Sequence, residues 1–241
     1  MSDLLELVLD AHGGLVNWRE VTTIDLRLTL RGRLLQVKQQ PQGLQGALVK
    51  IATQRPRTLI SPFPHPGARG LFENRAVAIQ TSSGQLIAAL DRPRETFAGH
   101  ERTTPWTQLQ LLYFIGYAFW NYFTTPFLLA VNGVSVVEIE PWEENGETWR
   151  VLQANFPEDL DTHCAIQNFY FNDKGLLQRH DYFTDVGRGS AAHYVFDHAT
   201  FDGFIFPTHR RVVPRGDGNI ATLSAPSTFM IDLESVIVST G

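Results

Sequence analysis

Cysteine is nearly absent from this sequence of 241 residues, in which Cys164 is the only one. A single cysteine cannot form an intramolecular disulfide, so the core alone has to stabilise the fold. A chain of this length can bury a core large enough to do so. We interpret Cys164 as a small, structural residue of a strand, although His163 beside it would suit a nucleophile.

An excess of basic residues is also missing. The chain has 20 lysines and arginines against 25 aspartates and glutamates, for a formal net charge of −5. Nucleic-acid binding relies on a basic stripe that neutralises phosphates, so we expect no nucleic-acid partner. The one arginine group, at Arg210, Arg211 and Arg215, is expected to be the solvated edge of a strand.

Motifs for cofactors are lacking too. The sequence has no Gly-rich phosphate loop, no cysteine pairs at zinc spacing, no His-Glu-x-x-His and no Gly-x-Ser-x-Gly, so we expect no cofactor. No linker, charge block or repeat divides the chain, which predicts one domain over residues 1–241. The first residues, 1–6, carry acids where an export signal would carry lysine or arginine, so we expect a cytoplasmic protein.

Alternating hydrophobicity is what the sequence has in abundance. A helix is expected over residues 2–12, capped by Ser2, and strand alternation begins at Thr22. Further strands are expected at 46–53, 57–61, 71–80, 85–91, 134–140, 147–154, 164–172, 176–184, 191–201, 204–213, 219–224 and 228–238. The pattern predicts a mainly β fold with helices, of the α+β class.

One segment interrupts the strands, because residues 103–137 contain no charge and many aromatic side chains. Thr104 followed by Pro105 predicts a helix start, and the helix should run to about Asn121 before residues 124–126 break it. The helix could be buried in the core, cover a ligand cavity, or span a membrane. Polar residues interrupt it and no basic anchors flank it, so we expect no stable membrane insertion.

Several short motifs resemble a known superfamily. They are the segments 11–14, 113–117, 124–129, 180–182 and 193–195. These segments occur in a chain that consists mostly of a long meander of alternating strands. In these the chain resembles an uncharacterised bacterial branch of the LolA/LolB-like superfamily of half-barrels, which includes lipoprotein carriers and VioE-like proteins. The resemblance implies a curved antiparallel sheet with an apolar concave face and a helical plug or lid. The carriers work outside the inner membrane, whereas VioE-like members are cytoplasmic and convert an aromatic intermediate without a cofactor.

The histidines gather late in the chain, with five of the eight between residues 163 and 209. Hairpin turns at residues 172–175, 184–191 and 202–203 set a register that places five polar side chains on one face of the sheet. These are Gln167, His180, Tyr182, His193 and Asp197. Arg179, Asp181 and Arg211 fall on the other face, which we expect to be solvated. A slip of one residue would exchange the two faces.

The polar residues on this face predict proton transfer near neutral pH. His180 and His193 would transfer protons, Tyr182 would donate a hydrogen bond to a substrate oxygen, and Asp197 would orient a histidine. The alternatives are hydrogen-bonded sheet residues without a catalytic role, or a metal site formed by His180, His193 and Asp197. The ligand-binding residues that we expect are Gln167, Tyr113, Tyr117, Trp120 and Phe169.

Together these patterns predict a half-barrel that binds a hydrophobic and preferably aromatic small molecule. We expect a cofactor-independent lyase, isomerase or cyclase. The alternative is a lipid or small-molecule carrier without catalytic activity, whose cavity would be almost wholly apolar.

Overall fold

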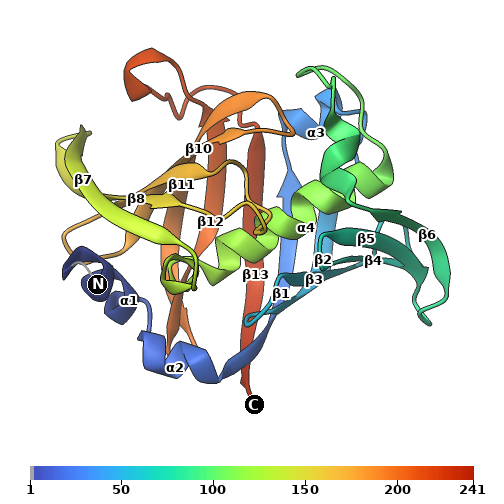
Figure 1. The fold of residues 1–241 in the computed structure, drawn as a ribbon, viewed down its shortest axis with the longest axis horizontal. Helices are drawn as coiled ribbons and strands as arrows, with labels where there is room; N and C mark the ends of the chain where they lie inside the picture. Colours follow the sequence, from blue (N-terminus) through green and yellow to red (C-terminus); the bar gives the residue numbers. More distant parts are fainter. Residues whose placement is uncertain (1–2) are drawn as a thin grey trace.

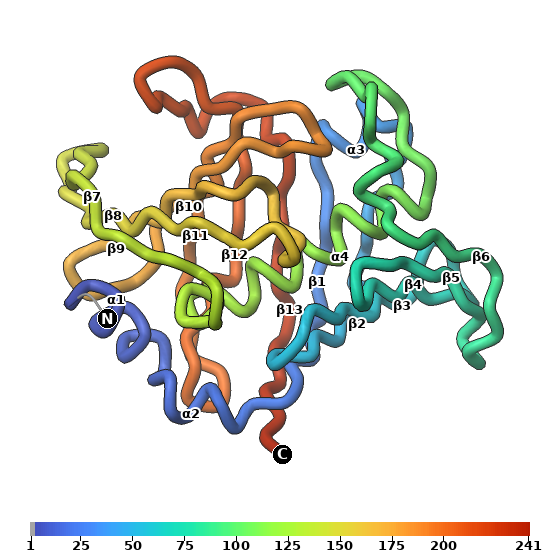
Figure 2. The backbone as a smooth tube through the Cα atoms, in the orientation of Figure 1, coloured from blue at the N-terminus to red at the C-terminus, as the bar shows by residue number. Residues whose placement is uncertain are grey.

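A single sheet dominates the computed structural model, which describes residues 3–241. Its thirteen strands are antiparallel and lie in the order β6-β5-β4-β3-β2-β1-β13-β12-β11-β10-β9-β8-β7. The strands are β1 (Val21–Arg31), β2 (Leu44–Ala52), β3 (Arg57–Ser61), β4 (Ala68–Glu73), β5 (Ala76–Thr81), β6 (Leu86–Asp91), β7 (Ser135–Glu144), β8 (Glu147–Asn155), β9 (Ile166–Phe171), β10 (Leu177–Thr184), β11 (Gly189–Phe201), β12 (Phe204–Pro214) and β13 (Phe229–Thr240). The sheet bends around one face, as Figures 1 and 2 show, which confirms the predicted α+β half-barrel.

Four α-helices accompany the sheet in the described residues. Helices α1 (Asp3–Ala11) and α2 (Leu15–Glu20) precede β1, α3 (Arg33–Val37) follows it, and α4 (Gln108–Thr124) lies between β6 and β7. Short 3-10 turns form at η1 (Pro93–Phe97), η2 (Phe127–Ala130) and η3 (Asp217–Asn219). Helix α4 crosses the concave side of the sheet (Figure 1). The predicted cap Ser2 lies outside the described residues.

Strand β1 joins the two halves of the sheet. It pairs with β2 on one side and with β13, the last strand of the chain, on the other. Its alternating residues Ile24, Leu26, Leu28 and Leu30 are buried, as the period of two predicted. The apolar face of β1 is therefore part of the core.

The strand predictions fail in two places. The expected strand 71–80 is a hairpin of β4 and β5, whose turn residues Asn74 and Arg75 have φ values of 50° and 60°. Two left-handed residues form a tight turn, but arginine is an uncommon residue there, so the pattern did not reveal it. The strand expected at 219–224 is a loop that follows η3. Helix α3 was not predicted.

Helix α4 starts later than Thr104 and Pro105 suggested. Its N-cap is Thr107, whose side chain accepts a hydrogen bond from the backbone N–H of Gln110 at 3.2 Å. Gln110 Oε1 in turn accepts from the backbone N–H of Thr107 at 2.9 Å, which completes a capping box. The helix ends at Thr124, three residues beyond the predicted Asn121 and within the predicted break at residues 124–126.

Helix α4 fills the interior of the half-barrel. Almost all its side chains are buried, and Gly116 packs directly on Phe72 of β4. The hydroxyl of Thr58 donates to the carbonyl of Gly116 at 2.9 Å, and Trp120 Nε1 donates to the carbonyl of Ala52 at 2.9 Å. The core interpretation of this segment is therefore correct. No helix among the described residues is long and apolar enough to cross a membrane.

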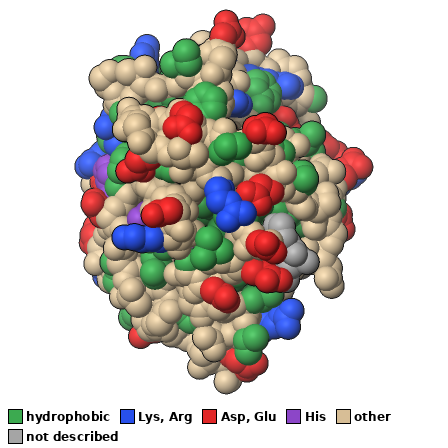
Figure 3. All heavy atoms as spheres, turned by 90° about the vertical axis from the view of Figure 1, so that its left-hand side faces the viewer, with side chains coloured by type: hydrophobic (Ala, Val, Ile, Leu, Met, Phe, Trp, Pro, Cys, Tyr) green, Lys and Arg blue, Asp and Glu red, His purple; other side chains and the backbone are tan. Residues whose placement is uncertain are grey.

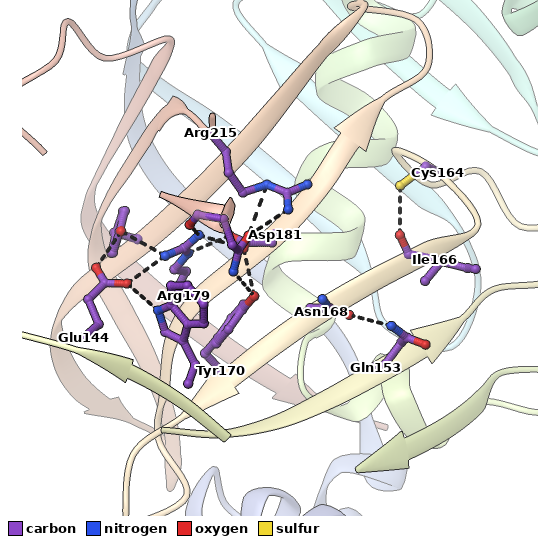
Figure 4. A network of polar contacts seen from close by, with 12 residues as sticks. Glu144, Gln153, Cys164, Ile166, Asn168, Tyr170, Arg179, Asp181 and Arg215 are labelled. Atoms are coloured by element: carbon purple, nitrogen blue, oxygen red, sulfur yellow. Dashed lines mark hydrogen bonds and ion pairs between the residues drawn. The ribbon is translucent and has the colours of Figure 1, made fainter. Parts of the chain in front are cut away.

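The convex face of β9–β11 carries a buried ionic network, shown in Figure 4. Arg179 donates from Nε and Nη2 to the two carboxylate oxygens of Asp181 at 2.7 and 2.8 Å, and from Nη1 to Glu144 at 2.7 Å. Its guanidinium also lies 5.1 Å from the ring centre of Tyr170. The prediction that Arg179 and Asp181 are solvated was wrong, because the end of the β7–β8 hairpin and the loop around Asn219 cover them.

Many other charged side chains reach the surface. Figure 3 shows the face on the side of α1 and β7, where acidic side chains are scattered and hydrophobic ones form small, separate groups. This view of the described residues has no extended apolar patch.

Replacing Gly116 with alanine should lower the free energy of unfolding by about 1–3 kcal/mol, the usual effect of overpacking. A Cβ at this position would lie 2.4 Å from Phe72 Cβ, which outweighs the roughly 1 kcal/mol that alanine gains over glycine inside a helix. Urea denaturation measures the difference. Gly216→Ala is the control, because its Cβ would meet nothing nearer than the Ile220 carbonyl oxygen at 3.8 Å. Equal stability of the two variants would contradict the close packing of α4.

Candidate functional site

Four buried side chains form a hydrogen-bonded series inside the half-barrel, which we call the Tyr–His chain. Tyr117 Oη lies 3.1 Å from His163 Nδ1, and Tyr122 Oη lies 2.7 Å from His163 Nε2. Tyr122 Oη is also 2.7 Å from Tyr182 Oη. The chain thus runs from the middle of α4, through the loop between β8 and β9, to β10.

The loop that carries His163 is held against α4. Asn121 Nδ2 donates to the carbonyl of Asp161 at 3.0 Å, and the backbone N–H of Asp185 donates to the carbonyl of His163 at 3.0 Å. The ring of His163 stacks on that of Tyr182, with ring centres 4.0 Å apart. These contacts fix the imidazole between the two tyrosines of the helix.

The Tyr–His chain is uncharged at neutral pH. Burial, helped by the nearby positive charge of Arg94, lowers the pKa of His163 to about 3. Burial raises the pKa of Tyr122 and of Tyr182 above the ordinary value of a phenol. Because His163 is neutral, one ring nitrogen donates a hydrogen bond and the other accepts one.

His180 and His193 lie on the concave face, as predicted, but in a register shifted by two residues. They pair directly with each other across β10 and β11, whereas the turns had predicted Tyr182 opposite His193. A shift of two preserves the face of every side chain. His180 Nε2 lies 2.6 Å from Gln167 Oε1, and its ring stacks on Phe169 with centres 4.1 Å apart.

His193 has no hydrogen-bond partner for either ring nitrogen among the described residues, although it is fully buried. Its ring meets that of Tyr122 edge-on, with centres 4.4 Å apart. Burial lowers the pKa of both His180 and His193 well below the usual value, so they do not titrate near neutral pH as we expected.

The other predicted residues lie apart from this cluster. Asp197 is exposed and has a φ of 55°. Within the described residues its carboxylate forms no hydrogen bond with His180 or His193, so it orients neither. Trp120 faces β2, as its bond to Ala52 shows. Tyr113 donates to Asp161 at 2.9 Å beside a separate, polar pocket lined by Arg75 and Arg94. These positions do not form one site with His180 and His193.

Arg210 is buried, and the expectation of a solvated arginine group was wrong for it. Its Nη2 donates to the carbonyl of Tyr122 at 3.1 Å, and its guanidinium lies 5.0 Å from the ring centre of Phe123. Burial lowers the pKa of Arg210 to about 10, against the raising effect of Tyr122 and Tyr182. It therefore stays a cation and stabilises the negative end of the α4 dipole.

A small pocket with a cavity volume of about 40 Å³ opens where α4 meets the ends of β10–β13. Most of its wall is apolar, and Tyr122 and Tyr182 contribute to it. The lining residues are Leu34, Arg102, Phe114, Tyr122, Tyr182, Thr184, Gly187, Gly189, Ser190, Ala191, Val212, Pro214, Thr228 and Phe229. We call it the apical pocket. It is narrow, so a bulky ligand requires its rim to open.

Of the predicted site residues, the structure places only Tyr182 on the apical pocket. Gln167, His180, Phe169 and His193 lie behind it. Sequence reasoning missed Tyr122 and His163 as site residues. Tyr122 was one of many aromatics in the uncharged segment, and His163 precedes β9 in a loop whose course no local pattern predicts. In the described residues no three His, Cys, Asp or Glu side chains group as metal ligands would.

The buried histidines predict acid sensitivity. The folded-state pKa values of His12, His163, His180 and His193 lie below the unfolded value of 6.5, so the folded protein binds fewer protons. Stability is thus complete above pH 6.5 and is lost as pH falls. Between pH 6.5 and 5.5 each such histidine should cost about 1 kcal/mol of unfolding free energy, measured by urea denaturation.

His193→Leu isolates one of these contributions. It removes two unpaired buried nitrogens, so its stability at pH 7.5 should equal or exceed that of the wild type. Its loss of stability between pH 6.5 and 5.5 should be smaller by about 1 kcal/mol. The same acid-dependent loss in both proteins would contradict the burial of a neutral His193.

Comparison with known proteins rests on structure alone, because no family model and no curated protein sequence matches this chain. A LolA superfamily protein from Nitrosomonas europaea aligns with a TM-score of 0.54 and 9% identity over 99% of this chain and 93% of its own. A DUF1329 family protein from Desulfovibrio piger aligns with a TM-score of 0.55 and 10% identity over 100% and 95%.

A third solved structure is described as an outer membrane lipoprotein-sorting protein domain from Vibrio parahaemolyticus. It aligns with a TM-score of 0.53 and 8% identity over 98% of this chain and 92% of its own. At such identities the likeness concerns the fold alone. The chain thus has the LolA-like fold that its sequence motifs resemble.

Proposed function

We propose that this protein binds a hydrophobic small molecule or lipid in the apical pocket, as a carrier or binding protein without catalytic activity. The observation that carries the proposal is the pocket itself. It lies where α4 meets the ends of β10–β13, its wall is mostly apolar, and Tyr122 and Tyr182 are among the few residues with a polar group that line it. Apolar walls with a few polar groups are typical of small-molecule sites.

Binding is favoured over catalysis because the pocket lacks a group that exchanges protons near neutral pH. The two tyrosines on its wall have raised pKa values, and the neutral His180 and His193 lie behind them. Arg102 is the one charged side chain on its wall in the described residues, and it is exposed. General acid–base catalysis needs a pKa close to the working pH, so these residues do not suit the predicted lyase, isomerase or cyclase.

The fold supports a hydrophobic ligand. The solved structures that align over nearly the whole chain include a LolA superfamily protein and a domain described as lipoprotein-sorting. Aromatic side chains on the pocket wall, Phe114 and Phe229 among them, suit a flat or chain-like apolar molecule. A cytoplasmic location remains a prediction, which cell fractionation tests.

Gly189→Leu should block the pocket. A Cβ at Gly189 would meet only Thr184 Oγ1 at 4.0 Å, so a side chain there enters the mouth without a clash. The neutral dye N-phenyl-1-naphthylamine fluoresces in apolar surroundings and should bind the wild type at one saturable site. The variant should bind it at least ~10-fold more weakly, which corresponds to about 1.4 kcal/mol of lost binding energy.

Gly216→Leu is the matched control, since Gly216 does not line the apical pocket and its Cβ would also be unobstructed. It should bind the dye like the wild type, and circular dichroism should show that both variants are folded. Absence of saturable binding to the wild type would overturn the proposed function. Equal binding by all three proteins would place the dye site elsewhere.

A further inference from the structure

The Tyr–His chain can be hydrogen-bonded in two directions. If His163 carries its proton on Nδ1, Tyr182 donates to Tyr122, Tyr122 donates to His163 Nε2, and Nδ1–H donates to Tyr117. If the proton is on Nε2, every bond reverses. Tyr117 then donates to Nδ1, Nε2–H donates to Tyr122, and Tyr122 donates to Tyr182. Both directions fit the same three distances.

The two directions differ in which hydroxyl is left without an acceptor. With Nδ1–H it is Tyr117, which is fully buried and has no other hydrogen-bond partner among the described residues. With Nε2–H it is Tyr182, which lies on the wall of the apical pocket. A buried donor without an acceptor costs about 1–3 kcal/mol. The second direction avoids this cost, because water or a ligand in the pocket can accept from Tyr182.

We propose that Tyr182 donates its hydroxyl proton to an uncharged carbonyl oxygen of the bound molecule, and that the pocket thereby selects apolar ketones or esters over hydrocarbons of the same shape. This inference rests on the proposed function and adds the polar group of its ligand. The neutral Tyr–His chain provides the polarity, because His163 with Nε2–H directs each successive hydroxyl toward the pocket.

The ligand oxygen should be an acceptor without charge. A carboxylate inside the pocket would lose its hydration. Among the described residues that line the pocket, Arg102 is the only cation, and its side chain is exposed. The cation Arg210 lies behind Tyr122 and already bonds to the backbone of the helix. A carbonyl oxygen needs one donor, which is what Tyr182 offers.

Two naphthalenes of equal shape test the selection. 2-Acetylnaphthalene carries a carbonyl group where 2-isopropenylnaphthalene carries a methylene group. Each is titrated against N-phenyl-1-naphthylamine bound to the wild type, Tyr182→Phe, Tyr122→Phe and Tyr194→Phe. The wild type should bind the ketone ~5–10-fold more tightly than the alkene, the usual contribution of one hydrogen bond. Tyr182→Phe should bind both equally, with unchanged affinity for the alkene.

The other two variants identify the donor. Tyr122→Phe keeps the hydroxyl of Tyr182 and should retain the preference for the ketone. Tyr194→Phe, on the convex face, should also retain it. Loss of the preference in Tyr122→Phe but not in Tyr182→Phe would overturn the assignment of the donor. Tighter binding of 2-naphthoate than of the ketone would overturn the uncharged ligand class.

The outcomes separate this inference from the proposed function. If both naphthalenes displace the dye with equal affinity from the wild type, the pocket binds apolar molecules but the inference fails. If neither binds, the proposed function fails with it. Nitrogen-15 NMR of His163, assigned by its loss in His163→Gln, gives an independent answer. The inference requires the Nε2–H tautomer in the free protein, and an Nδ1–H tautomer would overturn it.

Discussion

The burial of α4 is the constraint on which the rest of this structure depends. The polar groups of a helix inside a half-barrel cannot bond to water. Each one left without a partner would lower the free energy of unfolding by about 1–3 kcal/mol. The sequence meets this requirement at both ends. Thr107 and Gln110 satisfy donors at the first turn, and Arg210 reaches the carbonyl of Tyr122 near the last. The absence of charge from the buried residues of α4, Gln110–Thr124, follows from the same constraint.

The phenols of α4 meet the same requirement and create the site. Tyr113, Tyr117 and Tyr122 each carry a hydroxyl into the interior, where Asp161 and His163 bond to them. Both partners come from the loop between β8 and β9. The hydrogen bonds to the phenols of α4 therefore place a neutral imidazole inside the half-barrel. The Tyr–His chain that results ends at Tyr182, which lines the apical pocket.

The sequence predicted the fold well because the burial of one face of a sheet imposes a period of two on the apolar residues, and most strands show this period. It also predicted the shared face of His180, Tyr182 and His193, since an error of two residues does not change the face. Prediction from the sequence failed where contacts between distant segments determine whether a side chain is buried. The burial of Arg179 and Arg210 depends on a hairpin, a loop and a helix end that lie far away in the sequence. The partner of Tyr122 likewise lies in a loop without periodicity.

The pairing of β1 with β13 determines when the sheet can be completed during synthesis of the chain. Residues near the start of the chain pair with residues near its end, from Val21 with Thr240 to Arg31 with Met230. A chain emerging from the ribosome can form the hairpins β2–β6 early, but the seam at the centre of the sheet closes only after β13 has been synthesised. Until then the apolar side of α4 that packs against β10–β12 lacks its cover. From the synthesis of α4 until then, the nascent chain exposes aromatic side chains of this helix.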